Sequence, residues 1–147
     1  MPTNLYGPND NYDLESSHVL AALLRKAHEA KARGERKLVV WGSGTPRREF
    51  LHANDLADAC VFLMERGIGE GVFNVGIGAD LSIRELVEII MRVVGFDGEV
   101  VFDTSKPDGT PRKLLDVTRM KALGWTAKID LPSGIRSTYE DLRRSLQ

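Results

Sequence analysis

The chain has 147 residues, of which 42% are hydrophobic and 28% are charged, the composition of an ordinary folded domain. Twenty basic and twenty-one acidic side chains give a net charge of -1, which argues against a surface dedicated to nucleic acid or to an anionic membrane. No apolar run approaches the roughly 20 residues of a membrane-spanning helix, and the N-terminus has no signal-peptide pattern.

The first third of the chain predicts a connection, a helix and two strands. Residues 1–16 are turn-rich and follow no earlier element, so we expect them to be the remnant of a connection to another domain. Apolar residues then recur at helical spacing up to Gly34, with Ser16 or Ser17 as the N-cap. Residues 37–41, KLVVW, are typical of a buried strand, and residues 49–52, EFLH, of a shorter one.

A second helix is predicted from Asn54 or Asp55, either of which suits the N-cap, to about Arg66. Its expected inner face holds Leu56, Cys60, Leu63 and Met64. Cys60 is the only cysteine and lies in this apolar run, so we expect it in the core. A single cysteine also excludes an intramolecular disulfide, which favours a reducing cytoplasm as the location.

The second half continues the alternation of strands and helices. Strands are expected at 71–76 and 99–103, and helices at 82–95, at 116–124 and from Ser133 to Leu146. The helix at 82–95 has the strongest signal, because Ser82 and Glu85 form a capping box. This alternation favours an α/β or α+β fold in which helices cover a small sheet. Only three or four short strands are expected, and their open edges suggest a lobe of a larger assembly or self-association into a homo-oligomer.

The common catalytic and cofactor motifs are absent from the sequence. Gly76 and Gly78 follow a predicted strand as in a dinucleotide-binding loop, but Leu81 occupies the third glycine position and Ser82 already caps the helix. We therefore expect a turn there. The sequence has no Walker motif, no Gly-x-Ser-x-Gly elbow and no cluster of metal ligands, so no metal site is predicted.

The three histidines differ in their surroundings. His28 lies among charged helix positions and is expected on the solvated surface, whereas His52 follows a strand and is expected to satisfy a backbone group. His18 lies in the first turn of a helix beside a segment rich in Asn and Asp. A histidine there can donate or accept a proton near neutral pH, although a purely structural role remains open.

The stretch WGSGTPRREFLH, residues 41–52, contains more than a loop requires. Glycines and a proline set the backbone, but the tryptophan and the arginines have no role in a turn. Arg47 or Arg48 could bind phosphate oxygens through two parallel hydrogen bonds, while Trp41 offers a flat face to a sugar or base. This combination suits a nucleoside diphosphate. Surface arginines beside a core tryptophan are the alternative.

A second polar loop, residues 106–113, has the sequence KPDGTPRK. Its cations Lys106, Arg112 and Lys113 could face phosphates, and Asp108 could accept hydrogen bonds from ribose hydroxyls. Turn chemistry alone also explains the Pro-Asp-Gly sequence, so both interpretations stay open.

Four segments together resemble one family. Residues 2–30 (PTNLYGPNDNYDLESSHVLAALLRKAHEA), 39–59 (VVWGSGTPRREFLHANDLADA), 73–78 (FNVGIG) and 105–119 (SKPDGTPRKLLDVTR) look like consecutive motifs of the GDP-L-fucose synthases, which are extended short-chain dehydrogenase/reductases. The resemblance implies a C-terminal substrate-binding lobe covering residues 1–147. It also implies the family's reaction: GDP-4-keto-6-deoxy-D-mannose is epimerised at C3 and C5 and then reduced at C4 with NADPH.

The resemblance further implies roles for individual residues. His18 matches the family's acid for epimerisation and lies near the cofactor. The residues expected beside the nicotinamide end of NADP are Pro2, Thr3, Asn4 and Leu5. The residues expected to contact the GDP-sugar are Lys26, Trp41, Arg48 and Asp108.

The resemblance also implies parts that these residues do not contain. The family's glycine-rich fingerprint, its Tyr-x-x-x-Lys motif and the cysteine that works with the histidine all belong to an N-terminal NADP-binding half. We therefore expect this chain alone to bind NADP poorly and to be inactive, with the N-terminal half and the GDP-sugar as its partners. The alternatives are a non-catalytic GDP-sugar-binding module, a lobe of another nucleotide-sugar epimerase or dehydratase, and a piece without a function of its own.

Overall fold

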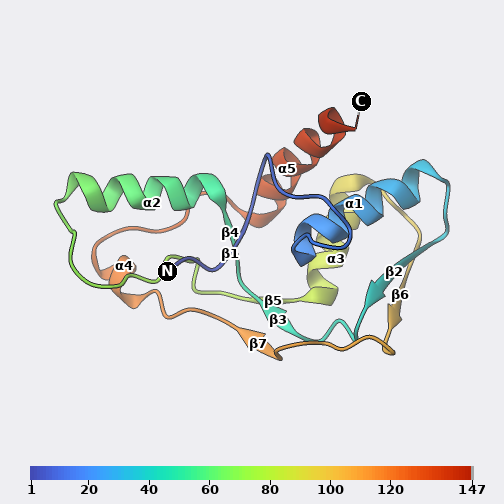
Figure 1. Ribbon diagram of the computed structural model, residues 1–147, viewed down its shortest axis with the longest axis horizontal. Coiled ribbons are helices and arrows are strands. Elements are labelled where there is room, and N and C mark those ends of the chain that lie inside the picture. Colours follow the sequence, from blue (N-terminus) through green and yellow to red (C-terminus); the bar gives the residue numbers. More distant parts are fainter. Residues whose placement is uncertain (147) are drawn as a thin grey trace.

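Five helices and seven short strands alternate through residues 1–146, the part of the chain that the computed structural model describes (Figure 1). The helices are α1 Val19–Ala32, α2 Ala53–Glu65, α3 Ile83–Val94, α4 Thr118–Ala122 and α5 Leu131–Ser145. The strands are β1 Asn4–Tyr6, β2 Lys37–Trp41, β3 Arg47–Arg48, β4 Phe50–His52, β5 Leu81–Ser82, β6 Glu99–Asp103 and β7 Arg112–Lys113. The predicted α/β alternation is confirmed. No helix in the described residues is both long and apolar enough to cross a membrane.

The strands form three small sheets. β1 pairs with β4 in parallel, and β2 pairs with β6 in parallel. The third sheet has the order β5-β3-β7, with β3 antiparallel to β5 and parallel to β7. The sequence predicted fewer strands because β3, β5 and β7 have only two residues each, and β1 has three residues within the segment expected to be a turn-rich connection. Such strands exist only where the fold lays separate loops side by side, and no local pattern marks them.

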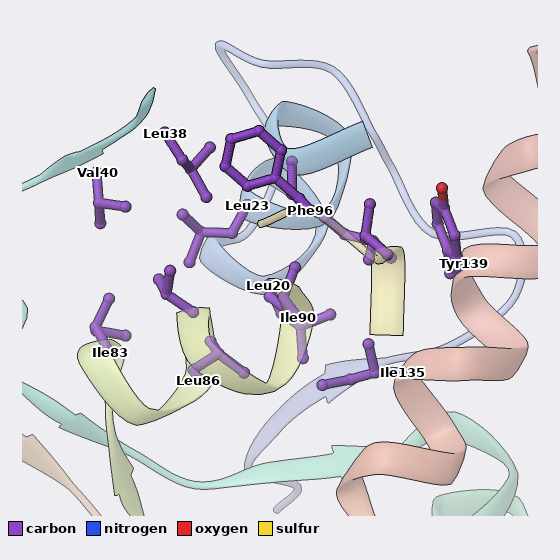
Figure 2. Packing of buried hydrophobic residues seen from close by; sticks show 14 of the residues in the cluster. Leu20, Leu23, Leu38, Val40, Ile83, Leu86, Ile90, Phe96, Ile135 and Tyr139 are labelled. Atoms are coloured by element: carbon purple, nitrogen blue, oxygen red, sulfur yellow. The ribbon is translucent and has the colours of Figure 1, made fainter. Parts of the chain in front are cut away.

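The main hydrophobic core lies between α1, α3, α5 and the inner face of β2 (Figure 2). Figure 2 shows side chains from these four elements converging on one volume. Its fully buried members include Leu20, Leu24, Leu86, Ile90 and Ile135. We use the name α1–α3 region for α1, α3, β2 and β6 together with the main hydrophobic core.

A second, smaller core lies beneath α2 and α4, at the other end of the molecule in Figure 1. Its buried members are Leu51, Ala59, Val75, Met120 and Trp125. We call α2, α4 and the segments around this core the α2–α4 region.

The helix ends test the predicted caps. The capping box of α3 is present as predicted, and Gly95 ends the helix in the left-handed conformation with φ 71°. The predicted serine cap of α1 is wrong, because the N-cap is His18 and its side chain makes no capping hydrogen bond. α5 begins two residues before Ser133, since the Asp130 carboxylate accepts a hydrogen bond from the Ser133 amide at 2.9 Å.

The helix α2 departs most from prediction. Its N-cap is His52 rather than Asn54 or Asp55, and its buried residues are Asp55 and Ala59. Leu56 and Leu63 of the predicted inner face pack against the second core, but Cys60 is exposed and Met64 is 78% exposed, so the prediction is wrong for these two residues. The face of α2 that packs on the rest of the chain is centred on Asp55 and Ala59 and also includes Leu56, Phe62 and Leu63.

Two strand predictions also change. The expected strand at 71–76 is only a single bridge between Pro2 and Val75. β2 forms as predicted but is buried on one side only: Leu38 and Val40 face the core, whereas Trp41 is 61% exposed. The apolar run at residues 37–41 therefore packs against the core with one face of the strand, and its other face is exposed.

Candidate functional site

A cavity of about 310 Å³ opens between α1, the end of β2 and the loops that follow β2 and β6. Its apolar wall contains Leu23, Val40 and Ile83, which belong to the main core. Its polar wall contains the four residues that the sequence assigned to substrate contact, namely Lys26, Trp41, Arg48 and Asp108. These residues come from three segments far apart in the sequence.

Trp41 presents its indole to two cationic side chains. The Lys26 ammonium lies 4.7 Å from the centroid of the ring, and the Lys106 ammonium lies 5.5 Å from it. Partial burial lowers the pKa of Lys26, because desolvation disfavours its charged form. Since Trp41 is 61% exposed, the alternative of a core tryptophan is excluded.

The two adjacent arginines have different surroundings. Arg47 Nε donates to Asp80 at 2.8 Å, and its Nη1 lies 3.5 Å from the Glu85 carboxylate. Arg48 Nη1 donates to the Arg47 carbonyl at 2.8 Å, and within residues 1–146 no carboxylate pairs with it. A guanidinium has five N–H donors, so most of those on Arg48 are available to a ligand in the cavity.

β7 places a second cation beside Arg48. Lys113 is the register partner of Arg48 in the parallel pairing of β3 with β7. Register partners in neighbouring strands project to the same side of a sheet, so the two cations belong to one face. The sequence grouped Lys113 with Lys106 and Arg112, but no local signal could single it out, because the pairing joins residues 65 positions apart.

Asp108 joins the two loops that frame the cavity. Its carboxylate accepts hydrogen bonds from the Ser43 amide at 2.6 Å and from the Ser43 hydroxyl at 2.8 Å. A Cβ at Gly42 would lie 2.4 Å from Asp108 Oδ1, and Gly42 has φ +84°, so only glycine permits this approach. Each carboxylate oxygen keeps a further lone pair for a ligand.

His18 is not one of the residues that line the cavity, although it adjoins two of them in the sequence. The residues on either side of it, Ser17 and Val19, line the cavity, and the His18 side chain is exposed. The imidazole makes no hydrogen bond with another group in residues 1–146, although it occupies the N-cap of α1.

The segment assigned to the cofactor lies elsewhere, beside the second core. Thr3 Oγ1 and Asn4 Nδ2 donate to the Glu49 carbonyl at 3.2 and 2.7 Å, and Leu5 packs against the second core. Pro2 is exposed and forms the bridge to Val75. The side chains of Thr3 and Asn4 therefore bind the protein's own backbone.

The glycines at 76 and 78 accommodate a buried carboxylate. Glu49 is fully buried, and its oxygens accept hydrogen bonds from the Gly78 amide at 2.7 Å and the Leu115 amide at 3.1 Å. A Cβ at Gly76 would lie 2.4 Å from Glu49 Oε1. This glycine turn thus encloses Glu49, in agreement with the predicted turn.

The other two histidines serve the fold. His52 Nδ1 accepts a hydrogen bond from the Asn54 amide at 3.2 Å, as predicted for a residue that satisfies the backbone. Burial lowers the pKa of His52, and the nearby Asp55 opposes this only in part. His28 is not the solvated residue that was predicted, because it is half-buried and its Nδ1 lies 3.0 Å from the Tyr139 hydroxyl.

Comparison with known proteins identifies the family. A model of the NAD dependent epimerase/dehydratase family matches residues 1–76, just over half of the chain. The chain belongs to this family. It is 59% identical over 140 residues to the putative GDP-L-fucose synthase 2 of Arabidopsis thaliana and 54% identical over 151 residues to the GDP-L-fucose synthase of Escherichia coli K12. Each match covers 95% of this chain but only 43% and 46% of the relative, so the chain spans less than half their length.

Solved structures of family members have the same fold. A GDP-L-fucose synthetase from Naegleria fowleri bound to NADP matches with a TM-score of 0.89 at 30% identity, covering 99% of this chain and 46% of that one. A GDP-6-OMe-4-keto-L-xylo-heptose reductase from C. jejuni matches with a TM-score of 0.85 at 32% identity, covering 98% and 53%. The predicted resemblance to GDP-L-fucose synthases and the predicted fold of a C-terminal lobe are confirmed.

Proposed function

We propose that this chain is the GDP-sugar-binding part of a GDP-L-fucose synthase, which epimerises GDP-4-keto-6-deoxy-D-mannose at C3 and C5 and reduces C4 with NADPH. The observation that carries the proposal is the cavity lined by Lys26, Trp41, Arg48 and Asp108. A nucleoside diphosphate needs cations for its phosphates and a flat apolar face for its base or sugar, and this cavity offers both. The 59% identity to a putative GDP-L-fucose synthase supports the same substrate.

In this proposal Arg48 and Lys113 bind the diphosphate from one face of the β3–β7 pair. Arg48 supplies a planar fork for two phosphate oxygens, and Lys113 adds a second positive charge. Trp41 forms a wall of the pocket against which a flat ring can lie. Lys26 and Lys106, now beside the indole, can turn their ammonium groups toward the phosphates when a ligand arrives.

His18 is proposed as the acid of the epimerisation. The protons at C3 and C5 are acidic because they flank the C4 ketone, so epimerisation needs one group to remove a proton and another to return it on the opposite face. The exposed imidazole makes no capping hydrogen bond, and it lies near enough to the Asp10 carboxylate to interact with its charge. Replacing His18 with Asn should slow solvent-deuterium incorporation at C3 and C5 by ~100-fold in a complemented enzyme. Undiminished exchange would rule this role out.

The residues of this chain do not fit NADP as a complete site. Binding a dinucleotide requires a helix N-terminus behind a glycine-rich turn, and the glycine turn here is filled by the Glu49 carboxylate. Residues 2–5 are proposed to form only the edge that passes the nicotinamide. We therefore derive no reduction step from this chain, and we propose that hydride transfer depends on an NADP-binding half.

Two measurements test the proposal. In a calorimetric titration, we expect the chain to bind GDP saturably. If millimolar GDP produced no heat, and no change in the protein's spectra either, the proposed binding role would be overturned. In the second, the chain is mixed with a separately expressed N-terminal half of the E. coli relative, and NADPH oxidation is followed with the 4-keto sugar nucleotide. Restored oxidation supports the enzyme, whereas GDP binding without restoration favours a non-catalytic binding module.

A further inference from the structure

A nearly buried carboxylate lies between two arginines of the β5-β3-β7 sheet. The Asp80 side chain is 4% exposed. Arg47 Nε donates to Asp80 Oδ1 at 2.8 Å, and Arg112 Nε donates to Asp80 Oδ2. Arg47 Nη2 also donates to the Asp80 carbonyl at 2.9 Å, so Asp80 holds Arg47 at two points.

These contacts connect all three strands of one sheet. Arg47 belongs to β3, Arg112 belongs to β7, and Asp80 immediately precedes β5. Each strand has only two residues, so the ladder supplies few backbone hydrogen bonds. The Asp80 carboxylate therefore adds the side-chain contacts that hold β3 and β7 together.

The contacts of Asp80 divide the four cationic side chains of β3 and β7 into two pairs. Arg47 and Arg112 are register partners, as are Arg48 and Lys113. Because successive side chains of a strand point to opposite faces, Asp80 pairs with both arginines of the first pair on one face and leaves the second pair on the other. The two guanidinium groups hold the pKa of the Asp80 carboxyl below its usual range, so it stays ionised at neutral pH.

We infer that Asp80 is a positioning residue for diphosphate binding, acting through Arg48 and Lys113, which it does not itself bind. This inference rests on the proposed function. By anchoring Arg47 and Arg112 from the opposite face, Asp80 fixes the register that places Arg48 beside Lys113. Ligand binding then costs less ordering of the two cations, and the two arginines held by Asp80 do not compete for the phosphates.

The test compares GDP with guanosine, which has the base and ribose but no phosphate. Affinities are measured by NMR titration for wild type, Asp80→Asn, Arg112→Gln and the control Glu88→Gln, which removes an equal charge from an exposed position on α3. We expect Asp80→Asn to weaken GDP binding about tenfold and to leave guanosine binding within about twofold. Glu88→Gln should leave both affinities unchanged.

A role limited to stability would give a different pattern. If Asp80→Asn fails to fold, Arg112→Gln still detaches β7 alone, and it should weaken GDP binding about threefold without affecting guanosine. Unchanged GDP affinity, or parallel losses for GDP and guanosine, would overturn the inference while the proposed function stands. Wild-type protein that binds no GDP would overturn the proposed function and the inference with it.

Discussion

The α1–α3 region and the α2–α4 region differ in how much apolar packing holds them together. In the α1–α3 region, α3 alone buries Ile83, Leu86, Val87, Ile90 and Val94, and the cavity wall stands directly on this core. In the α2–α4 region, α2 buries only Asp55 and Ala59. The proposed binding pocket thus rests on apolar packing, the most rigid support available in a small domain.

The α2–α4 region adds hydrogen bonds from acidic side chains to its smaller apolar core. The Asp55 carboxylate accepts hydrogen bonds from the Lys128 amide at 3.1 Å and the Ile129 amide at 3.0 Å, and Asp58 accepts one from Trp125 Nε1 at 2.8 Å. Apolar side chains of this region remain on its surface, including Val61, Met64 and Val72. Damage to the first region should therefore act mainly through lost packing, whereas damage to the second can also leave polar groups unsatisfied.

The largest expected effect comes from Leu86→Ala in the main core. Leu86 is fully buried, and a buried Leu→Ala change typically lowers the free energy of unfolding by about 2–5 kcal/mol. GDP binding should fail together with folding, because the cavity wall shares this core. Urea denaturation measures the loss, with Met64→Ala as the exposed control. A loss below about 1 kcal/mol would contradict the comparison.

Arg48→Ala should separate binding from folding. We expect GDP binding to weaken by about 1.5–3 kcal/mol, the range for hydrogen bonds to charged groups. The free energy of unfolding should change by no more than about 0.5 kcal/mol, since Arg48 donates internally only to a backbone carbonyl. Calorimetry and urea denaturation measure the two quantities, with the exposed Arg36→Ala as the matched control. An unchanged dissociation constant would show that Arg48 is an ordinary surface residue without a role in GDP binding.

Asp55→Ala should give the opposite result. It leaves the amides of Lys128 and Ile129 without an acceptor, which should lower the free energy of unfolding by about 1–3 kcal/mol. GDP affinity of the folded protein should stay within about twofold, because Asp55 lies in the other region. Asp55→Asn keeps one acceptor oxygen and should lose less stability. Weaker GDP binding in Asp55→Ala at a temperature where it is folded would show that the regions are coupled.

The smallest effect concerns pH. Burial holds the pKa of His52 below its ordinary 6.5, so the folded state takes up this proton less readily than the unfolded state. The stability that His52 contributes is present above about pH 6.5 and falls as pH drops toward the folded-state pKa. His52→Asn keeps an acceptor for the Asn54 amide but does not titrate. Lowering the pH from 7.5 to 5.5 should therefore lower the melting temperature of the wild type more than that of the variant. Equal decreases would contradict this assignment.

Local patterns in the sequence predicted the parts of the fold that local forces decide. The capping box at Ser82 and the apolar periodicity of α1 and α3 predicted those helices, because each signal lies within one element. The chemistry of the loop that contains Trp41 and Arg48 also predicted which side chains would line a cavity.

The features that the sequence did not predict all depend on contacts between distant segments. Cys60 is exposed because the packed face of α2 is centred on Asp55 and Ala59, and its neighbours in the fold decide this rather than the apolar periodicity of the helix. Arg47 and Arg48 have the same chemistry, and only the position of Asp80, 33 residues further along, decides which of them is neutralised. The pairing of Arg48 with Lys113 likewise depends on two-residue strands that exist only in the folded chain.

The two tryptophans offer the most direct test of the proposed GDP pocket, because Trp41 lies in the cavity and Trp125 is buried in the second core. Their indole N–H groups can be followed separately in an NMR titration with GDP. We predict that the Trp41 signal moves saturably while the Trp125 signal stays in place. A stationary Trp41 signal at millimolar GDP, or a shift confined to Trp125, would contradict the pocket.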